Sequence, residues 1–391
     1  MSYPEPDVLN ALVARVFRIE DVTLGEPARG LIARYRGMLL SEDSAAAYDQ
    51  LAESLKGYEI TPLFRKESGG QVVYLVPRKP DAKPARVSVN ILLFLLTVLS
   101  VLYVGSYMST DVPASGAAPP LTAGWPYAVS LLSILLAHEF GHYLVSRFHH
   151  TRATLPYFIP LPLPPLGTMG AAIVMQGTPK NKRVLFDIGV AGPLAGMVVA
   201  IPVLLLGLSL SHLDVIKGID GMVQMEGNSI IYLAAKFITF GRLLPEPATY
   251  GGISPFLYWL RYFFTGHPIP LGATDVFIHP VAFAGWAGLL VTSLNLIPAG
   301  TLDGGHVVYS LFGEKARRAY PFILLSLLGL GFFWNGWWIW AVLLLWLGRV
   351  HAEPLDQITK LNPARLVVAA LAIAVFILTF SPVPLSLFSG Q

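Results

Sequence analysis

The hydrophobic pattern divides the chain near residue 87, because long apolar runs dominate everything that follows Ser88. A helix that crosses a bilayer needs about 20 apolar residues. The best candidates are residues 89–108, 124–148, 184–210, 280–298 and 366–380. The run 319–347 is too long for one crossing, and Asn335-Gly336 divides it into two. The pattern therefore predicts a polytopic α-helical membrane protein with six or seven transmembrane helices.

Two further apolar segments, residues 230–240 and 255–264, are too short to cross. They are either re-entrant or lie at the membrane interface. Both lie in the long segment 211–279, which has about the length of a small domain but is rich in apolar runs, Pro and Gly. We therefore expect no peptide-binding module to be inserted there.

The first 86 residues are rich in charged side chains and predict a small soluble α+β domain. Residues 30–40 are expected to form a strand, and Ser41-Glu42-Asp43 to cap a helix that ends near Leu55. Residues 58–65 and 71–76 then predict two strands joined by a turn at 68–70. A polar linker at 79–84 leads to the transmembrane domain, residues 87–391. Because Met1–Pro6 is polar and no apolar core follows, we expect no signal peptide.

Composition and charge narrow the class of protein. The chain of 391 residues is 54% hydrophobic and 13% charged, whereas soluble domains are about 45–50% apolar and about 25% charged. This argues against a purely soluble enzyme and against a disordered or fibrous chain. A net charge of +3 gives no reason to expect nucleic acid as a partner. The absence of cysteine excludes disulfides, thiolate metal sites and a cysteine nucleophile.

Basic residues near the ends of the runs predict the orientation, since Lys and Arg favour cytoplasmic loops. Four clusters fall on one side if the N-terminus is cytoplasmic: Lys79, Lys83 and Arg86; Arg147, Arg152, Lys180, Lys182 and Arg183; Lys315, Arg317 and Arg318; Arg349, Lys360 and Arg365. The segment 211–279 departs mildly from the pattern with four basic residues, but long loops weigh less in this rule. We predict an integral multi-pass protein whose active site opens to the cytoplasm.

The second run contains His138-Glu139-Phe140-Gly141-His142. Two histidines four residues apart lie on one face of a helix, so both imidazoles can reach one metal ion. Glu139 is rotated by about 100° and can contact a metal-bound water instead of coordinating. Neutral imidazole suits zinc. Burying two imidazoles and a carboxylate at membrane depth costs free energy unless they coordinate a metal ion or pair with one another. A proton relay or a polar helix contact is the alternative interpretation.

A catalytic zinc usually has three protein ligands, so a third should come from elsewhere. The best candidate is Asp303, in the segment 295–305 at the end of the fourth run. Pro298 and the pair Gly304-Gly305 allow the helix to break there, so that the backbone can bend towards the metal. The alternative is that Asp303 is a turn residue before the glycines.

With these motifs the chain resembles the site-2 protease family of intramembrane zinc metalloproteases. The resemblance rests on the histidine motif, on Asn295-Leu296-Ile297-Pro298 with Leu302-Asp303-Gly304-Gly305, and on Gly192-Pro193-Leu194-Ala195-Gly196 between them. It covers a catalytic core from about 124 to 311. It implies that His138, His142 and Asp303 hold one zinc ion per chain, that Glu139 is the general base, and that Asn295 helps to bind the substrate backbone.

Residues 155–176 resemble the membrane-dipping β-hairpin that family members place beside the zinc. Residues 167–173 would form its edge, with Gly170 as a substrate-binding residue. An unwound substrate can add to such an edge through backbone hydrogen bonds. For the prolines between 160 and 165, an interfacial loop is the simpler interpretation.

The function implied is hydrolysis of a peptide bond in or near the transmembrane helix of a membrane protein, as in regulated intramembrane proteolysis. The expected partners are a single-span substrate and the lipid bilayer, and the oligomeric state stays open. The N-terminal domain is the natural regulatory candidate. A zinc- or proton-coupled transporter would also need intramembrane His and Asp, and a silent scaffold would have no need of Glu139.

Overall fold

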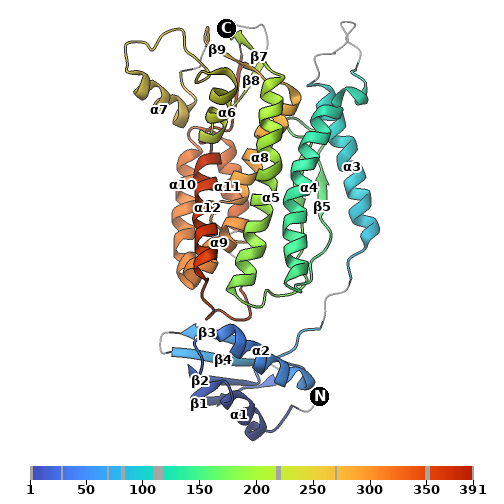
Figure 1. Cartoon of the computed structure of the whole chain (residues 1–391), viewed down its shortest axis with the longest axis vertical. Helices are drawn as coiled ribbons and strands as arrows, with labels where there is room; N and C mark the ends of the chain where they lie inside the picture. Colours follow the sequence, from blue (N-terminus) through green and yellow to red (C-terminus); the bar gives the residue numbers. More distant parts are fainter. Residues whose placement is uncertain are drawn as a thin grey trace.

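The computed structural model describes residues 3–27, 30–67, 70–80, 84–108, 118–216, 222–268, 271–347 and 353–389. A helical bundle forms the middle of an elongated molecule, a small α+β domain lies at one end, and a cap of short elements lies at the other (Figure 1). The chain begins in the α+β domain and ends at the cap. The predicted turn residues Ser68 and Gly69, the linker residues 81–83 and the basic residue Arg349 lie outside the described ranges.

The N-terminal domain contains more elements than the sequence pattern predicted. Its elements are α1 (Pro6–Ala14), β1 (Phe17–Leu24), β2 (Ala33–Leu39), α2 (Ser44–Leu55), β3 (Ile60–Glu67) and β4 (Gly70–Pro77). The strands form one antiparallel sheet in the order β1-β2-β4-β3. The predicted β-α-β-β core is present, but α1 and β1 were missed. β1 is an edge strand with mostly exposed side chains, so it lacks the alternation of a half-buried strand.

Three helices are long and apolar enough to cross a membrane in the part of the chain that the structure describes. They are α3 (Val87–Ser106), α4 (Trp125–Phe148) and α5 (Lys182–Ser209). α5 begins where the side chain of Asn181 accepts a hydrogen bond from the backbone amide of Val184. Large apolar side chains stay exposed along α3, among them Leu92, Leu95 and Leu99, as expected for a surface that faces lipid.

The other apolar runs form shorter helices: α8 (Pro280–Asn295), α9 (Asp303–Phe312), α10 (Tyr320–Leu330), α11 (Gly336–Leu347) and α12 (Pro363–Thr379). The predicted division near Asn335 is present. At 1.5 Å per residue, α10 and α11 are each about 16–18 Å long, which is about half the thickness of a hydrocarbon core. The number of crossings therefore stays a prediction. α8 and α9 are two parts of an interrupted helix, broken at residues 296–302.

Residues 211–279 contribute most of the cap. They contain β7 (His212–Val215), β8 (Met222–Glu226), α6 (Ile230–Phe240), α7 (Pro255–Thr265) and β9 (Thr274–Phe277). β7 pairs with β9, and β8 pairs with β10 (Leu385–Ser389) near the C-terminus. Both short apolar helices lie at the end of the bundle that is farthest from the N-terminal domain (Figure 1).

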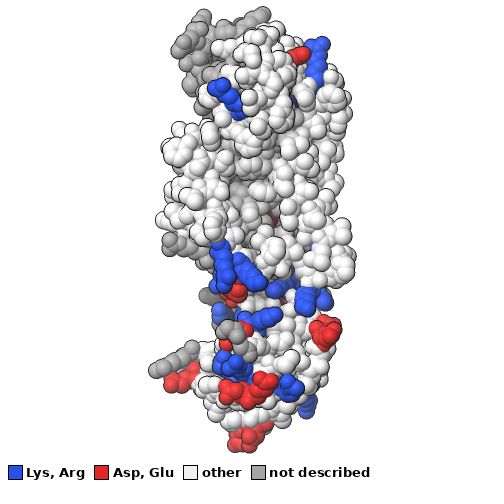
Figure 2. Space-filling model, turned by 90° about the vertical axis from the view of Figure 1, so that its left-hand side faces the viewer, with Lys and Arg blue, Asp and Glu red and all other residues white. Residues whose placement is uncertain are grey.

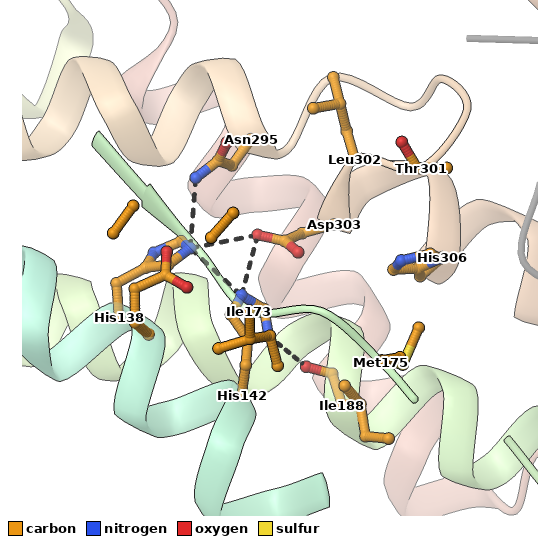
Figure 3. A pocket seen from close by; sticks show the side chains of 13 residues that line it. His138, His142, Ile173, Met175, Ile188, Asn295, Thr301, Leu302, Asp303 and His306 are labelled. Atoms are coloured by element: carbon orange, nitrogen blue, oxygen red, sulfur yellow. Dashed lines mark hydrogen bonds and ion pairs between the residues drawn. The ribbon is translucent and has the colours of Figure 1, made fainter. Parts of the chain in front are cut away.

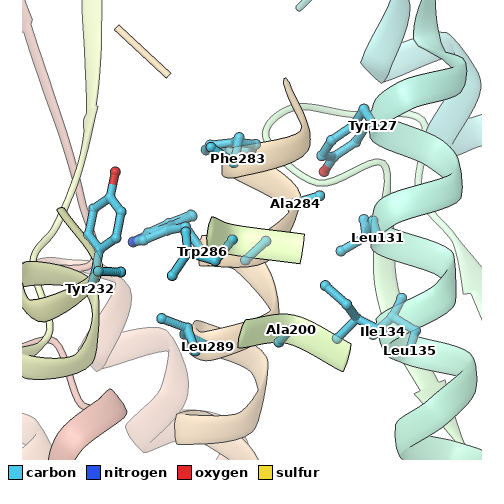
Figure 4. Close-up of a cluster of buried hydrophobic side chains, with 14 of the residues drawn as sticks. Tyr127, Leu131, Ile134, Leu135, Ala200, Tyr232, Phe283, Ala284, Trp286 and Leu289 are labelled. Carbon is cyan, nitrogen blue, oxygen red and sulfur yellow. The ribbon is translucent and has the colours of Figure 1, made fainter. Parts of the chain in front are cut away.

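The main hydrophobic core lies between α4, α5 and α8 (Figure 4). Tyr127 of α4 and Phe283 of α8 approach with ring centroids 6.0 Å apart. Small residues allow the helix backbones to come close, and Ala200 and Ala284 are fully buried there. Close contact through small residues is how helices associate in a membrane. This core fixes α4, which holds the histidine pair, against α8, which leads to Asp303.

A strand-like segment, residues 353–357, joins the N-terminal domain to the bundle. The amide of Phe64 in β3 donates to the carbonyl of Leu355 at 2.9 Å, and the amide of Gln357 donates back to Phe64 at 3.0 Å. On its other side, the amide of Asp356 donates to the carbonyl of Lys180 at 2.9 Å. Asp356 is fully buried, and its carboxylate accepts a hydrogen bond from Ser44 of α2. The sheet edge is thus connected to the loop from which α5 begins.

Candidate metal centre

The histidine motif lies within α4, where its three polar side chains are buried. His138, Glu139 and His142 are 3%, 5% and 6% exposed. The four-residue spacing brings both rings to one face, and their Nε2 atoms are 3.2 Å apart. Burial of this kind needs a partner for each polar atom, because an unpaired charge or hydrogen-bonding group is costly in an apolar interior.

Asp303 meets the histidines from a different part of the chain. It is the first residue of α9, and its Oδ2 lies 3.3 Å from Nε2 of His138 and 3.2 Å from Nε2 of His142 (Figure 3). The break between α8 and α9 is tight. A Cβ at Gly304 would lie 2.0 Å from the carbonyl oxygen of Leu296, so this close approach requires glycine. The expected interruption of the helix is therefore what places Asp303 at the site.

The spacing of the three ligand atoms fits a zinc ion. Tetrahedral zinc with bonds of about 2.0–2.1 Å places its ligand atoms about 3.3–3.4 Å apart. The three separations here are 3.2, 3.2 and 3.3 Å. Two imidazole nitrogens and one carboxylate oxygen are also the donor types that zinc takes in hydrolytic sites. The residues present therefore fit the metal in both chemistry and geometry.

The backbone of α5 orients one of the ligands. Nδ1 of His142 lies 2.7 Å from the carbonyl oxygen of Ile188 (Figure 3). A carbonyl only accepts, so Nδ1 must carry the proton, and Nε2 keeps its lone pair for the metal. Asn295, the last residue of α8, places its side-chain nitrogen 3.2 Å from Nε2 of His138. Asn295 therefore lies at the edge of the cluster.

The glycine motif of α5 was given no separate role from the sequence, but in the structure it packs against the ligands. A Cβ at Gly192 would lie 2.0 Å from Nε2 of His142, and a Cβ at Gly196 would lie 3.3 Å from His138. Both glycines therefore form the wall against which the ligands pack. The signal was present in the sequence, since two small residues four apart in an apolar helix indicate close helix contact.

A cavity of about 390 Å³ surrounds the cluster. Its described lining includes the three ligands, Glu139 and Asn295, together with Ala171, Ala172, Ile173, Met175, Ile188, Thr301, Leu302 and His306. His306, three residues after Asp303, thus faces the same space. Gly170 is not part of the described lining, although the residues that follow it are.

The lining residues 171 and 172 belong to a short antiparallel pair, β5 (Tyr157–Pro160) and β6 (Thr168–Ala172). Just after β6, Ile173 lines the same cavity as Glu139. β6 is paired on one side only, because its sheet has two strands in the described residues. The pair β5–β6 thus lies beside the centre with one edge of β6 unpaired in the described residues, and the membrane-dipping hairpin stays a prediction.

The family model and the similar proteins indicate the same family of metalloproteases. Residues 126–328 match the model for peptidase family M50. The chain is 30% identical over 323 residues to the Oryza sativa subsp. japonica protein named "Probable zinc metalloprotease EGY1, chloroplastic", which covers 76% of this chain and 50% of the relative.

Two Arabidopsis thaliana proteins are also similar. The one named "Probable zinc metalloprotease EGY1, chloroplastic" is 29% identical over 68% of this chain and 44% of its own length. The one named "Probable zinc metalloprotease EGY2, chloroplastic" is 26% identical over 98% of this chain and 66% of its own length. The chain spans about half the length of the first two of these three relatives.

Proposed function

The chain belongs to peptidase family M50, and from this premise we propose that it is an intramembrane zinc endopeptidase. Its reaction would be hydrolysis of a peptide bond in or near the transmembrane helix of a membrane protein. The observation that supports this most is that the ligand atoms of His138, His142 and Asp303 lie within 3.3 Å of one another. Glu139 lines the same cavity. Ligands and a carboxylate base are the minimal parts of a metal-dependent hydrolase.

The residues divide into distinct roles. His138, His142 and Asp303 would hold one zinc ion. When bound, zinc would act as a Lewis acid and lower the pKa of a coordinated water towards about 7. Glu139 takes a proton from the attacking water on its carboxylate and delivers it to the nitrogen of the leaving amine. Asn295 is placed to hydrogen bond to the substrate backbone beside His138.

The substrate would bind as an extended segment along β6. A transmembrane helix must unwind before one of its peptide bonds can reach the ligands, and the backbone groups released then need partners. The free edge of β6 offers such partners, and the next residues line the cavity. Gly170 would contribute here through its backbone. A single-span protein in the bilayer is the partner that this arrangement suits.

The orientation follows from charge. Lys and Arg side chains gather where the bundle meets the N-terminal domain (Figure 2), and basic residues favour the cytoplasmic face. We therefore place the N-terminal domain and the opening of the site on the cytoplasmic side of an integral multi-pass protein. The N-terminal domain would regulate access, since residues 353–357 connect it to the start of α5.

The test compares wild type, Glu139→Gln and the exposed control Glu53→Gln in lipid vesicles with a panel of single-span substrates. Glu139→Gln should lower the cleavage rate by about 10²–10⁴-fold, the usual contribution of an acid-base group. It should keep the zinc content of wild type, and Glu53→Gln should behave as wild type. Equal cleavage by wild type and Glu139→Gln would overturn the assigned base.

The same preparations test the transporter alternative. A transporter with this site would move zinc ions or protons across the vesicle membrane and cleave none of the substrates. Flux into vesicles that is altered by Glu139→Gln, together with no cleavage by wild type, would favour that class over the protease.

A further inference from the structure

A second cavity, of about 410 Å³, lies where the N-terminal domain meets the bundle. Three lysines line it from three separate segments: Lys66 of β3, Lys182 at the start of α5, and Lys315 in the 3-10 helix η4 (Gly313–Ala319). Gln357 of the connecting segment also lines it. The cavity is therefore enclosed by both parts of the molecule, and it is separate from the metal centre.

The acidic groups near this cavity are already satisfied by other partners. Glu314 is the acidic residue of the described lining, and it pairs with Arg317 at 3.2 Å and accepts the hydroxyl of Tyr309 at 3.1 Å. Asp356 accepts hydrogen bonds from Ser44 at 2.9 Å and from the amide of Ile358 at 2.7 Å. Both carboxylates still act on Lys182 through their charge, but Glu314 shares its charge with Arg317.

The three lysines make no direct ion pair, since none among the described residues joins Lys66, Lys182 or Lys315 to a carboxylate. Lys182 is partly buried, and its Nζ lies 3.3 Å from the position that a Cβ at Gly313 would take, so the glycine leaves room for the ammonium group. Asp356 and Glu314 favour the charge of Lys182, and Lys66 opposes it. Two carboxylates against three lysines leave an excess of positive charge at the cavity. Like charges held around one cavity cost free energy unless an anion offsets them.

The position of the cavity, at the end of the bundle next to the N-terminal domain, favours a phosphate ligand. Basic side chains gather at this junction, just beyond the apolar surface of the bundle (Figure 2). That is the depth at which lipid headgroups lie, and basic pockets at the cytoplasmic ends of transmembrane helices bind anionic headgroups. A soluble phosphate compound offers the same chemistry to the same lysines.

We propose that the cavity binds the phosphate group of an anionic ligand through Lys66, Lys182 and Lys315. The ligand is either the headgroup of an anionic phospholipid or a soluble phosphate compound. Because Lys66 belongs to the N-terminal domain and the other two lysines to the bundle, the bound phosphate links the two. The proposal does not depend on the protease activity.

The experiment uses the full chain in two arms. In the first, the protein is placed in nanodiscs of phosphatidylcholine with or without phosphatidylglycerol, and the retained lipid is counted by native mass spectrometry. In the second, lipid-stripped protein in a non-ionic detergent is titrated with pyrophosphate by calorimetry. The variants are Lys182→Gln, Lys315→Gln, Lys182→Arg and the control Lys360→Gln, an exposed lysine near the same junction that does not line the cavity.

Each lysine-to-glutamine change in the cavity should weaken binding by about fivefold, the effect of one basic residue near an anionic surface. Lys182→Arg and Lys360→Gln should bind as wild type. Dependence on phosphatidylglycerol identifies a headgroup, and the same pattern with pyrophosphate identifies a soluble phosphate compound. Zinc content checks that each variant is folded, and the exposed Lys315 provides an independent test if Lys182→Gln fails to fold. Equal binding by Lys315→Gln and Lys360→Gln in both arms would overturn the proposal.

Discussion

Two buried polar clusters in this molecule solve the same electrostatic problem differently. In the cap, Nζ of Lys236 lies 3.2 Å from Oδ1 of Asp275, and their side chains are 1% and 7% exposed. The ammonium also lies 4.5 Å above the ring of Tyr232. At the metal centre, a buried carboxylate meets two imidazoles instead. The cap thus contains its own cation as a lysine side chain.

The difference shows what each cluster needs. None of the described residues that line the central cavity is a lysine or an arginine. Neutral His142 keeps its lone pair on Nε2, because its proton is on Nδ1, where the carbonyl of Ile188 accepts it. The central cluster therefore presents electron-pair donors towards one point, which is the arrangement for a metal ion. The cap cluster instead pairs its carboxylate with a lysine of the chain, an arrangement that serves stability.

The largest effect should come from neutralising one carboxylate in each cluster. Asp303→Asn removes an anionic ligand and should reduce zinc from about one ion per chain to almost none, because two neutral imidazoles alone hold a metal poorly. Asp275→Asn should keep the zinc content of wild type. Elemental analysis of the purified proteins measures both. Full zinc content in Asp303→Asn would remove the distinction between the clusters.

The next effect concerns the cap. Lys236→Met leaves Asp275 buried without its partner and should cost about 3–5 kcal/mol of stability, measured by denaturant unfolding in detergent. Zinc content should not change. Replacing both partners, in Lys236→Met with Asp275→Leu, should recover part of the loss, since an apolar pair needs no counter-charge but Glu226 still lacks the charge of Lys236. A cap variant that loses zinc would show that the clusters are coupled.

Chelation should separate the two clusters without mutation. If zinc is present at a hundred times its dissociation constant, its removal lowers the free energy of unfolding by about 2.7 kcal/mol. Wild type and Lys236→Met should both show this loss with a chelator, whereas Asp303→Asn should show none. The melting temperature with and without chelator is the measurement. A chelator shift in Asp303→Asn would place the stabilising ion elsewhere.

The smallest effect should come from the wall behind the ligands. Gly192→Ala places a methyl group against His142 and should weaken zinc binding by about 10–100-fold, the usual cost of disturbing the surroundings of a ligand. Gly196→Ala meets its neighbour at 3.3 Å instead of 2.0 Å and should cost less. Competition with a fluorescent zinc chelator gives both affinities. An equal loss in both variants would contradict the packing explanation.

Much of the architecture was visible in the sequence because its causes are local. The apolar runs predicted the helices, and the division of the run 319–347 near Asn335 is present. The pairing of the histidines follows from helical periodicity, and Pro298 and Gly304 indicated where the helix is interrupted. Asp303 was chosen as the third ligand because it lies at the predicted break of the helix, and the resemblance to a family gave it the same role. No local rule predicts the contact itself, because Asp303 is so far along the chain from the histidines.

The rest depended on tertiary contacts. β1 carries charged residues on an exposed edge, so no alternation revealed it. The hydrogen bond from His142 to Ile188 and the role of Gly192 arise only when α5 packs against α4. The connection of residues 353–357 to β3 joins segments about three hundred residues apart, and it has no sequence signature.

The central claim is that a single zinc ion is held by residues from α4 and α9. Zinc-edge X-ray absorption spectroscopy of the purified wild-type protein tests it most directly. The account predicts two imidazole ligands among nitrogen and oxygen donors at about 2.0–2.1 Å. A protein that contains no zinc, or zinc without imidazole in its first coordination shell, would contradict it.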